Sequence, residues 1–301
     1  MGVRVGLIDV DGHNWPNLCL MKLSAYHKAQ GDSVEWWDGF AQYDRVYMSR
    51  VFDGTYSADH FEPCNAAEIV KGGTGYGLDN ELPPEVEHTR PDYDLYPAMT
   101  NGVAYGFLTR GCPRGCPFCV VAKKEGRRSR KVADLSEWWD GQRVIKLLDP
   151  NLLACPDHME LLQQLAGSGA WVDYTQGLDA RLLNRDNAAA IARTRAKMIH
   201  FAMDNMTDID AVTRGLKIYA EAVGGVDHRK AGVYILTNYN TTHEEDMERV
   251  RIVQSLGYKP YVMVYNKPTA PQITRDLQRW SNNPIIYAAA PDFADYEGRK
   301  Q

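Results

Sequence analysis

The sequence predicts an α/β protein with two domains, a small Rossmann-like α/β domain followed by a partial (β/α)6 barrel of the TIM type. The 301 residues are enough for about two domains. Residues 3–10 form an apolar, β-branched run that a helical pattern follows, and from residue 103 strand and helix patterns alternate six times. The expected boundaries are 1–75 for the small domain, 76–101 for a linker, 102–283 for the barrel and 284–301 for a C-terminal tail.

The small domain is predicted from three short strands and one helix. The expected strands are 3–10, 34–37 and 45–49, and the expected helix is 17–30, which ends at Gly31. Residues 53–101 are rich in proline and contain a glycine run at 71–77, so loop and linker are expected there. Because the run lacks the Gly-Lys-Ser/Thr ending of a phosphate-binding loop, a close-packed turn is favoured over a phosphate cradle.

The barrel is predicted from six strands, each followed by a helical pattern. The expected strands are 103–108, 143–148, 171–175, 197–203, 231–236 and 259–265. The expected helices are 134–140, 157–166, 185–194, 208–223, 242–256 and 271–281. Repeated strand–helix units favour a parallel sheet, either curved into part of a barrel or left open. Ligands of such sheets gather at the carboxyl ends of the strands.

Composition limits the classes of function. Lys and Arg total 34 against 39 Asp and Glu, a net charge of −5, so a generally basic nucleic-acid coat is absent. No apolar run approaches the roughly 18 residues of a membrane span, and the N-terminus reads as a strand without a cleavage site. Six cysteines are too few for a disulfide scaffold. We expect a cytoplasmic protein that does not bind membranes.

Three of the cysteines carry the strongest chemical signal. Cys112, Cys116 and Cys119 lie on a Gly/Pro-rich loop directly after the first barrel strand. Thiolates at this spacing are suited to zinc or to an iron–sulfur cluster. A structural zinc site needs a fourth ligand, which Cys155 or a histidine would have to supply through the fold. Three cysteines on a cube of four irons leave one iron open for a substrate.

The motif C-x3-C-x2-C, with Phe118 before the last cysteine, resembles that of the radical S-adenosylmethionine (radical SAM) superfamily. The resemblance covers residues 100–270. It implies an enzyme with a [4Fe-4S] cluster on Cys112, Cys116 and Cys119, whose open iron chelates SAM. It also implies reductive cleavage of SAM to a 5′-deoxyadenosyl radical that abstracts hydrogen from an unidentified substrate, with Phe118 near the adenine.

Further SAM contacts are expected after the next strands. Superfamily members often carry a Gly-Gly-Glu-like turn after the second strand, where this sequence has Asp149 and Asn151. Gln176 and Arg181 follow the third strand; Arg181 either pairs a ligand carboxylate or belongs to a helix-start network. Asp204 follows the fourth strand, where relatives place an acid on the ribose hydroxyls.

The small domain resembles the cobalamin-binding-type domain of some radical SAM proteins. The cobalamin signature is Asp-x-His-x-x-Gly; Asp11 and His13 match it, but Pro16 replaces the glycine. The stretch at 49–51 and the glycine pair at 72–73 are loose matches to later elements. The sequence therefore favours a degenerate domain that shapes the substrate entrance over one that holds cobalamin.

Residues 123–131 carry six positive charges just after the cysteines. They form either a solvated face or a site for a phosphate-bearing or acidic substrate, or for a flavodoxin- or ferredoxin-type reductant. Nucleic acid is a less favoured partner, because no recognisable RNA- or DNA-binding module accompanies the patch. Two alternative functions remain: a cobalamin-dependent radical SAM methyltransferase, and a non-catalytic nucleic-acid-binding protein stabilised by zinc or a cluster.

Overall fold

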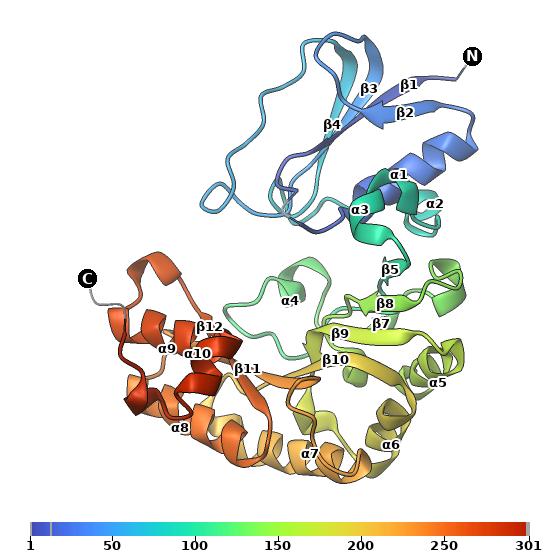
Figure 1. Ribbon diagram of the computed structural model, residues 1–301. Helices are drawn as coiled ribbons and strands as arrows, with labels where there is room; N and C mark the ends of the chain where they lie inside the picture. Colours follow the sequence, from blue (N-terminus) through green and yellow to red (C-terminus); the bar gives the residue numbers. More distant parts are fainter. Residues whose placement is uncertain (1, 13, 299–301) are drawn as a thin grey trace. The chain divides into compact units, whose positions relative to one another are not determined.

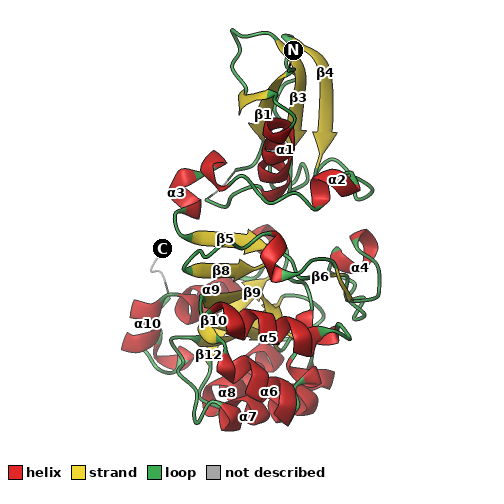
Figure 2. Cartoon of the chain, turned by 90° about the vertical axis from the view of Figure 1, so that its right-hand side faces the viewer, coloured by secondary structure: helices red, strands yellow, loops and turns green. Residues whose placement is uncertain are grey.

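The computed structural model describes residues 2–12 and 14–298 of the chain. It contains two parallel sheets, with strand orders β2-β1-β3-β4 and β12-β11-β10-β9-β8-β5 (Figures 1 and 2). The α/β class and the two sheets are as the sequence predicts. Among the described residues, no helix is both long enough and apolar enough to cross a membrane.

The chain divides into two compact units. Unit 1 comprises residues 1–127 and 131–146, and unit 2 comprises residues 128–130 and 147–301. Each unit is described separately below.

Unit 1 begins with the four-stranded parallel sheet. Its strands are β1 (Arg4–Asp9), β2 (Ser33–Trp36), β3 (Tyr43–Ser49) and β4 (Ala66–Gly72). The first three confirm the predicted strands, and α1 (Leu18–Ala29) confirms the predicted helix, with Asn17 as its N-cap. Strand β4 lies where the sequence predicts a loop. It is an edge strand without buried residues, so it lacks the alternation that marks a half-buried strand.

The two faces of this sheet are covered differently. On one face, Val5 and Leu7 of β1 pack with Leu20 and Leu23 of α1. On the other face, Ile8, Val46 and Met48 form a cluster that is covered by loop and strand side chains, among them Trp37 and Tyr76, rather than by a helix. Helix α1, with Val86 of the short helix α2 (Pro84–Glu87), therefore covers one face, and aromatic rings contribute to the core of the other.

The remainder of unit 1 consists of short elements. They are α2 (Pro84–Glu87), α3 (Pro97–Thr100), β5 (Val103–Gly106), β6 (Thr109–Arg110), α4 (Val121–Lys124) and β8 (Val144–Leu147), together with the 3₁₀ turns Tyr93–Leu95 and Leu135–Glu137. The two-residue strand β7 (Arg130–Lys131) is divided between the units, with Arg130 in unit 2, and Leu147 of β8 also belongs to unit 2. Strands β5 and β8 confirm two predicted strands.

The predicted helix 134–140 is wrong, because only the 3₁₀ turn forms there. Asp134 and Glu137 make the capping box of a helix start, but Trp138 leaves helical geometry at φ −132°. Its ring packs on Gly106, where an added Cβ would lie 2.3 Å from the indole. The tertiary contact of this buried tryptophan overrides the local helix signal.

Unit 2 contains four parallel strands and the helices that follow them. The strands are β9 (Trp171–Leu178), β10 (Arg195–Ala202), β11 (Ala231–Thr237) and β12 (Lys259–Val264). The helices are α5 (His158–Ser168), α6 (Arg185–Arg193), α7 (Ile209–Ala222), α8 (His243–Ser255), α9 (Gln272–Asn282) and α10 (Pro284–Ala289). All four predicted strands and five predicted helices are confirmed, and α10 lies in the predicted tail.

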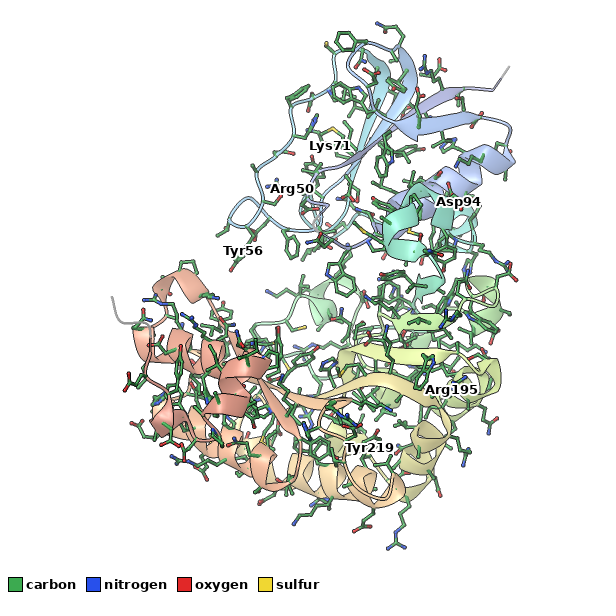
Figure 3. The ribbon with its side chains drawn as sticks, in the orientation of Figure 1. Arg50, Tyr56, Lys71, Asp94, Arg195 and Tyr219 are labelled. Carbon is green, nitrogen blue, oxygen red and sulfur yellow. The ribbon has the colours of Figure 1, made fainter. Side chains whose placement is uncertain are left out.

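Burial alternates along these strands, so that only one face of the sheet is deeply buried. That face includes Tyr174, Ile199, Phe201, Val233 and Val262, each at most 2% exposed. Figure 1 shows α5 to α8 along this side of the strands. Tyr219 of α7, labelled in Figure 3, places its ring 5.2 Å from that of Phe201. Most residues between the buried ones are half-buried or exposed.

Gly215 of α7 packs tightly against the turn that contains Ala180. A Cβ at this position would lie 1.8 Å from the carbonyl oxygen of Ala180. We expect Gly215→Ala to lower the free energy of unfolding by about 1–3 kcal/mol through overpacking. Gly167→Ala in α5, where an added Cβ meets nothing within 4 Å, is the control. It should raise stability by about 0.5–1 kcal/mol. Urea unfolding measures both, and a stabilising Gly215→Ala would contradict the close approach.

Candidate metal centre

The three cysteines lie on a loop that two glycine turns shape. The loop follows β5 and β6 and ends at α4. Gly111 and Gly115 adopt φ angles of +84° and +57°, which side-chain-bearing residues rarely adopt. The Cys112 amide donates to the Gly126 carbonyl at 3.2 Å, and the Cys119 amide donates to the Cys116 carbonyl at 2.9 Å. Backbone bonds thus turn the chain back on itself around the cysteines.

Glu125 closes the base of this loop. Its carboxylate accepts from the Arg110 guanidinium at 2.8 Å and from the Gly111 amide at 2.9 Å. The Arg110 guanidinium also lies 3.5 Å from the centre of the Phe107 ring. Glu125 is not among the site residues that the sequence predicts. The signal that could have identified it is that it is the single acid within the basic segment 123–131.

The three loop thiols are partly exposed and form no disulfide. Cys155 differs: it is 1% exposed, and burial raises the pKa of its thiol. A raised pKa disfavours the thiolate that binds metals, so Cys155 fits the predicted role of an ordinary buried thiol.

The loop thiols suit a soft metal centre by donor type. Three thiols on one loop are soft donors of the kind that bind zinc or an iron–sulfur cluster. Within residues 2–12 and 14–298, however, no three His, Cys, Asp or Glu side chains lie close enough together to hold a metal ion. The thiol donors therefore suit an iron–sulfur cluster by their chemistry. To bind one, the three side chains would have to turn toward a common point.

In unit 2, the predicted residues Asp149 and Asn151 are buried, at 4% and 3% exposure. The Asn151 amide nitrogen lies 3.4 Å from a carboxylate oxygen of Asp179. Ser129, buried within the basic segment, donates to the Asn151 carbonyl at 3.0 Å. Exposed Arg128 and Arg130 flank it, so Ser129 fixes this stretch while its arginines face solvent.

Arg181 belongs to a network of acids at the start of a 3₁₀ turn. Its guanidinium donates to both Asp179 oxygens, at 2.7 and 2.6 Å, and to Asp208 at 2.9 Å. Because Asp179 also contacts Asn151, two predicted residues share one carboxylate. This geometry favours the helix-start network over a free guanidinium awaiting a ligand.

Gln176 and Asp204 lie near the carboxyl ends of β9 and β10. Gln176 is exposed on β9, next to Gly177 with its φ of +91°. Asp204 is half-buried, and its carboxylate accepts from the Leu236 amide at 3.3 Å.

A buried ion pair, which sequence reasoning missed, holds the chain just before Asp204. Arg249 of α8 is completely buried, donates to the Met203 carbonyl at 2.9 Å and pairs with Asp246. Burial lowers the pKa of Arg249 and raises that of Asp246, because it penalises both charges. In a helix that otherwise carries many exposed charges, the sequence has no signal that singles out this pair.

In unit 1, Asp11 bridges the segments that follow β1 and β3. Its carboxylate accepts from the amides of Val51, at 2.9 Å, and Phe52, at 2.6 Å. His13, the cobalt ligand of the cobalamin signature, lies outside the described residues. An added Cβ at Gly73 would lie 2.3 Å from the Arg50 carbonyl oxygen, which supports the predicted close-packed turn. Figure 3 labels Arg50, whose guanidinium donates to the Ser57 carbonyl.

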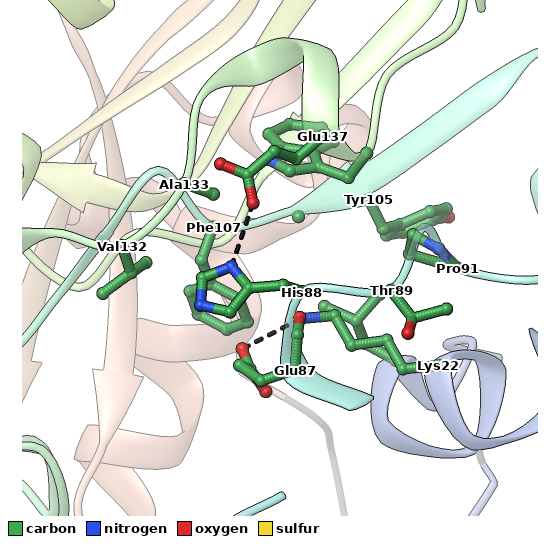
Figure 4. Close-up of a pocket in the computed structure, with 13 residues that line it drawn as sticks. Lys22, Glu87, His88, Thr89, Pro91, Tyr105, Phe107, Val132, Ala133 and Glu137 are labelled. Carbon is green, nitrogen blue, oxygen red and sulfur yellow. Dashed lines mark hydrogen bonds and ion pairs between the residues drawn. The ribbon is translucent and has the colours of Figure 1, made fainter. Parts of the chain in front are cut away.

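A small pocket in unit 1 lies beside the carboxyl end of β5 (Figure 4). His88 and Glu137 line it and contact each other at 3.0 Å, and Lys22 contacts the Glu87 carboxylate at 2.9 Å. The buried indole nitrogen of Trp138, also in the lining, has no hydrogen-bond partner. None of the sequence-predicted site residues lines this pocket.

No protein-family model matches the chain, and no curated protein matches it in sequence.

The Arg249–Asp246 pair yields a stability prediction. Arg249→Met leaves the Asp246 carboxylate buried without its cation, so the free energy of unfolding should fall by roughly 3–5 kcal/mol. The double variant Arg249→Met, Asp246→Leu removes both charges and should recover most of that loss, as measured by urea unfolding. Equal destabilisation in the single and double variants would show that packing, rather than the buried charge, dominates.

Proposed function

We propose that this protein is a radical SAM enzyme. The observation that carries the proposal is the loop of Cys112, Cys116 and Cys119, whose three unbridged thiols come after strand β5 of the six-stranded sheet and the short strand β6. Two left-handed glycines and the Glu125 carboxylate restrain the loop backbone without using a thiol. The three cysteines would hold a [4Fe-4S] cluster with one open iron.

The proposal assigns SAM to residues from several strand ends. Phe118 would contact the adenine, Asp149 or Asn151 the amino group, and Asp204 the ribose hydroxyls, with Gln176 beside them. Arg181 would act by orienting Asp179 and Asn151, which its bidentate contacts with Asp179 support. The proposal includes a six-stranded sheet curved into a partial barrel, preceded by a Rossmann-like unit that shapes the substrate entrance.

When bound, the cluster supplies the electron for reductive cleavage of SAM, which prepares hydrogen abstraction from a substrate. The chain's own residues restrain the loop, hold SAM and keep its reacting bond fixed. A flavodoxin- or ferredoxin-type protein is the proposed reductant. Exposed Lys123 and Arg127 of unit 1 supply positive charge suited to such an acidic partner, or to a phosphate-bearing or acidic substrate.

Anaerobic purification followed by cluster reconstitution tests the proposal. We expect about four irons and four sulfides per chain, and 5′-deoxyadenosine, detected by mass spectrometry, after dithionite and SAM are added. Cys116→Ala should abolish 5′-deoxyadenosine formation. Cys64→Ala removes an exposed cysteine outside the loop and should leave both the iron content and SAM cleavage unchanged. Asp204→Asn should retain iron but bind SAM more weakly.

Other outcomes would favour the two alternatives. Stoichiometric zinc without SAM cleavage would contradict the proposal and favour the zinc-stabilised nucleic-acid-binding protein. Cobalamin retained through purification, together with methyl transfer, would identify a cobalamin-dependent methyltransferase instead.

A further inference from the structure

The small pocket in unit 1 contains a buried hydrogen-bond donor that no described residue satisfies. The indole nitrogen of Trp138 is buried and has no hydrogen-bond partner within residues 2–12 and 14–298. Most buried polar groups in proteins are paired, so an unpaired one needs an explanation. Trp138 is 4% exposed and lines the pocket, and the whole lining belongs to unit 1. We call this space the indole pocket.

Packing places the indole nitrogen at the wall of the pocket. Gly106, another lining residue, would direct an added Cβ to within 2.3 Å of Cδ2 and 2.5 Å of Cε2 of the Trp138 ring. The ring therefore lies directly against the Gly106 backbone. Because Nε1 is bonded to Cε2, the unpaired N–H lies beside Gly106 as well. Figure 4 shows Phe107, His88 and Glu137 around the same space.

The charged groups of the lining are already paired. Glu137 accepts from the Asp134 amide at 2.8 Å and contacts His88 at 3.0 Å. Lys22 contacts the Glu87 carboxylate at 2.9 Å. An anion in the pocket would lie near two carboxylates and would find no cation of its own. Burying a charge without a partner is costly, so the pocket favours a neutral group.

The other walls are apolar or carry hydroxyls that are already bonded. The Thr89 and Tyr105 hydroxyls donate to backbone carbonyls, at 2.8 and 3.4 Å. Leu18, Phe107 and Val132 supply apolar surface. A single N–H in such surroundings is best matched by a group that only accepts a hydrogen bond, because a hydroxyl or a water brings protons that need acceptors of their own.

The volume of the pocket limits the group that enters it. The enclosed space is about 20 Å³. Since one water needs roughly 10–15 Å³, the pocket admits one oxygen-sized group rather than a ring. The His88 side chain, which borders the pocket, is 59% exposed, so the pocket opens toward solvent. A larger molecule can therefore insert one end and keep the remainder outside.

We propose that the indole pocket binds the carbonyl oxygen of a small neutral molecule, such as a ketone or an amide, and that the Trp138 N–H donates to this oxygen. The apolar walls enclose the carbonyl group, and the paired charges exclude carboxylates. None of the three loop cysteines lines the pocket, so this binding does not depend on the proposed function.

Three small molecules of the same shape test the proposal on the full chain. Acetone carries a neutral carbonyl oxygen, acetate is anionic, and acetamidinium carries N–H donors in place of the oxygen. The first readout is the Trp138 indole N–H signal in a proton–nitrogen NMR spectrum of protein with isotope-labelled tryptophan, assigned by its loss in Trp138→Phe. We expect acetone to move this proton signal downfield in a saturable way, and the other two molecules to leave it in place.

The second readout is saturation transfer to the acetone methyl groups. Trp138→Phe removes the donor and should weaken acetone binding about 3- to 10-fold, the range for one neutral hydrogen bond. Trp139→Phe is the matched control and should leave binding unchanged, because the Trp139 indole already donates to the Gln142 carbonyl at 2.9 Å and lies outside the lining. Ala133→Leu fills the pocket but keeps the donor, and it should abolish the shift of the Trp138 signal.

Ala133→Leu keeps the test decisive if Trp138→Phe fails to fold, because Ala133 is only half-buried. A Trp138 signal that acetone does not move would overturn the proposal and indicate that water alone fills the pocket. Equal shifts with all three molecules would overturn it too. SAM cleavage is measured separately, without any probe. Acetone binding without SAM cleavage would refute only the proposed function, whereas SAM cleavage without acetone binding would refute only the carbonyl site.

Discussion

The one-sided burial of the parallel sheet in unit 2 is the constraint on which the rest of that unit depends. Phe201, Val233 and Val262 are completely buried and point toward the helices, so each strand is locked in one register. A slip of one residue would exchange these side chains with the opposite set, which includes His200 and Tyr234. The hydrophobic core therefore fixes both the side chains that face away from the helices and the level at which each strand ends.

Buried polar groups then fix the segments beyond the strand ends. The Arg249 guanidinium holds the Met203 carbonyl, and the Asp179 carboxylate holds Arg181 and contacts Asn151. Removing such groups from water is costly unless they are paired, so their hydrogen bonds restrict the loops to few conformations. This restriction supports the proposed SAM contacts, because polar residues that hold a ligand bind better when they are already ordered.

The sequence predicts helices and strands well where the hydrophobic pattern agrees with a local signal such as a capping residue. Helix α8, for example, begins at Thr242 with the predicted capping box. Prediction from sequence fails where contacts between residues distant in the chain determine the local structure. The packing of the Trp138 ring ends a helix that Asp134 would start. Strand β4 pairs at the edge of its sheet although its sequence has no amphipathic pattern. For the site, spacing reveals the three cysteines, whereas the roles of Glu125 and Arg249 depend on partners that only the fold brings near.

The cysteine loop and the less buried face of the unit 2 sheet are constrained by the fold in different ways. The loop depends on backbone turns and thiols, and these are suited to a cofactor of fixed shape. The less buried face of the sheet carries side chains that can be exchanged without altering the buried face, because neighbouring residues of a strand point in opposite directions. If the proposed function holds, such a fold can keep one cofactor loop while the side chains of the less buried face change with the substrate.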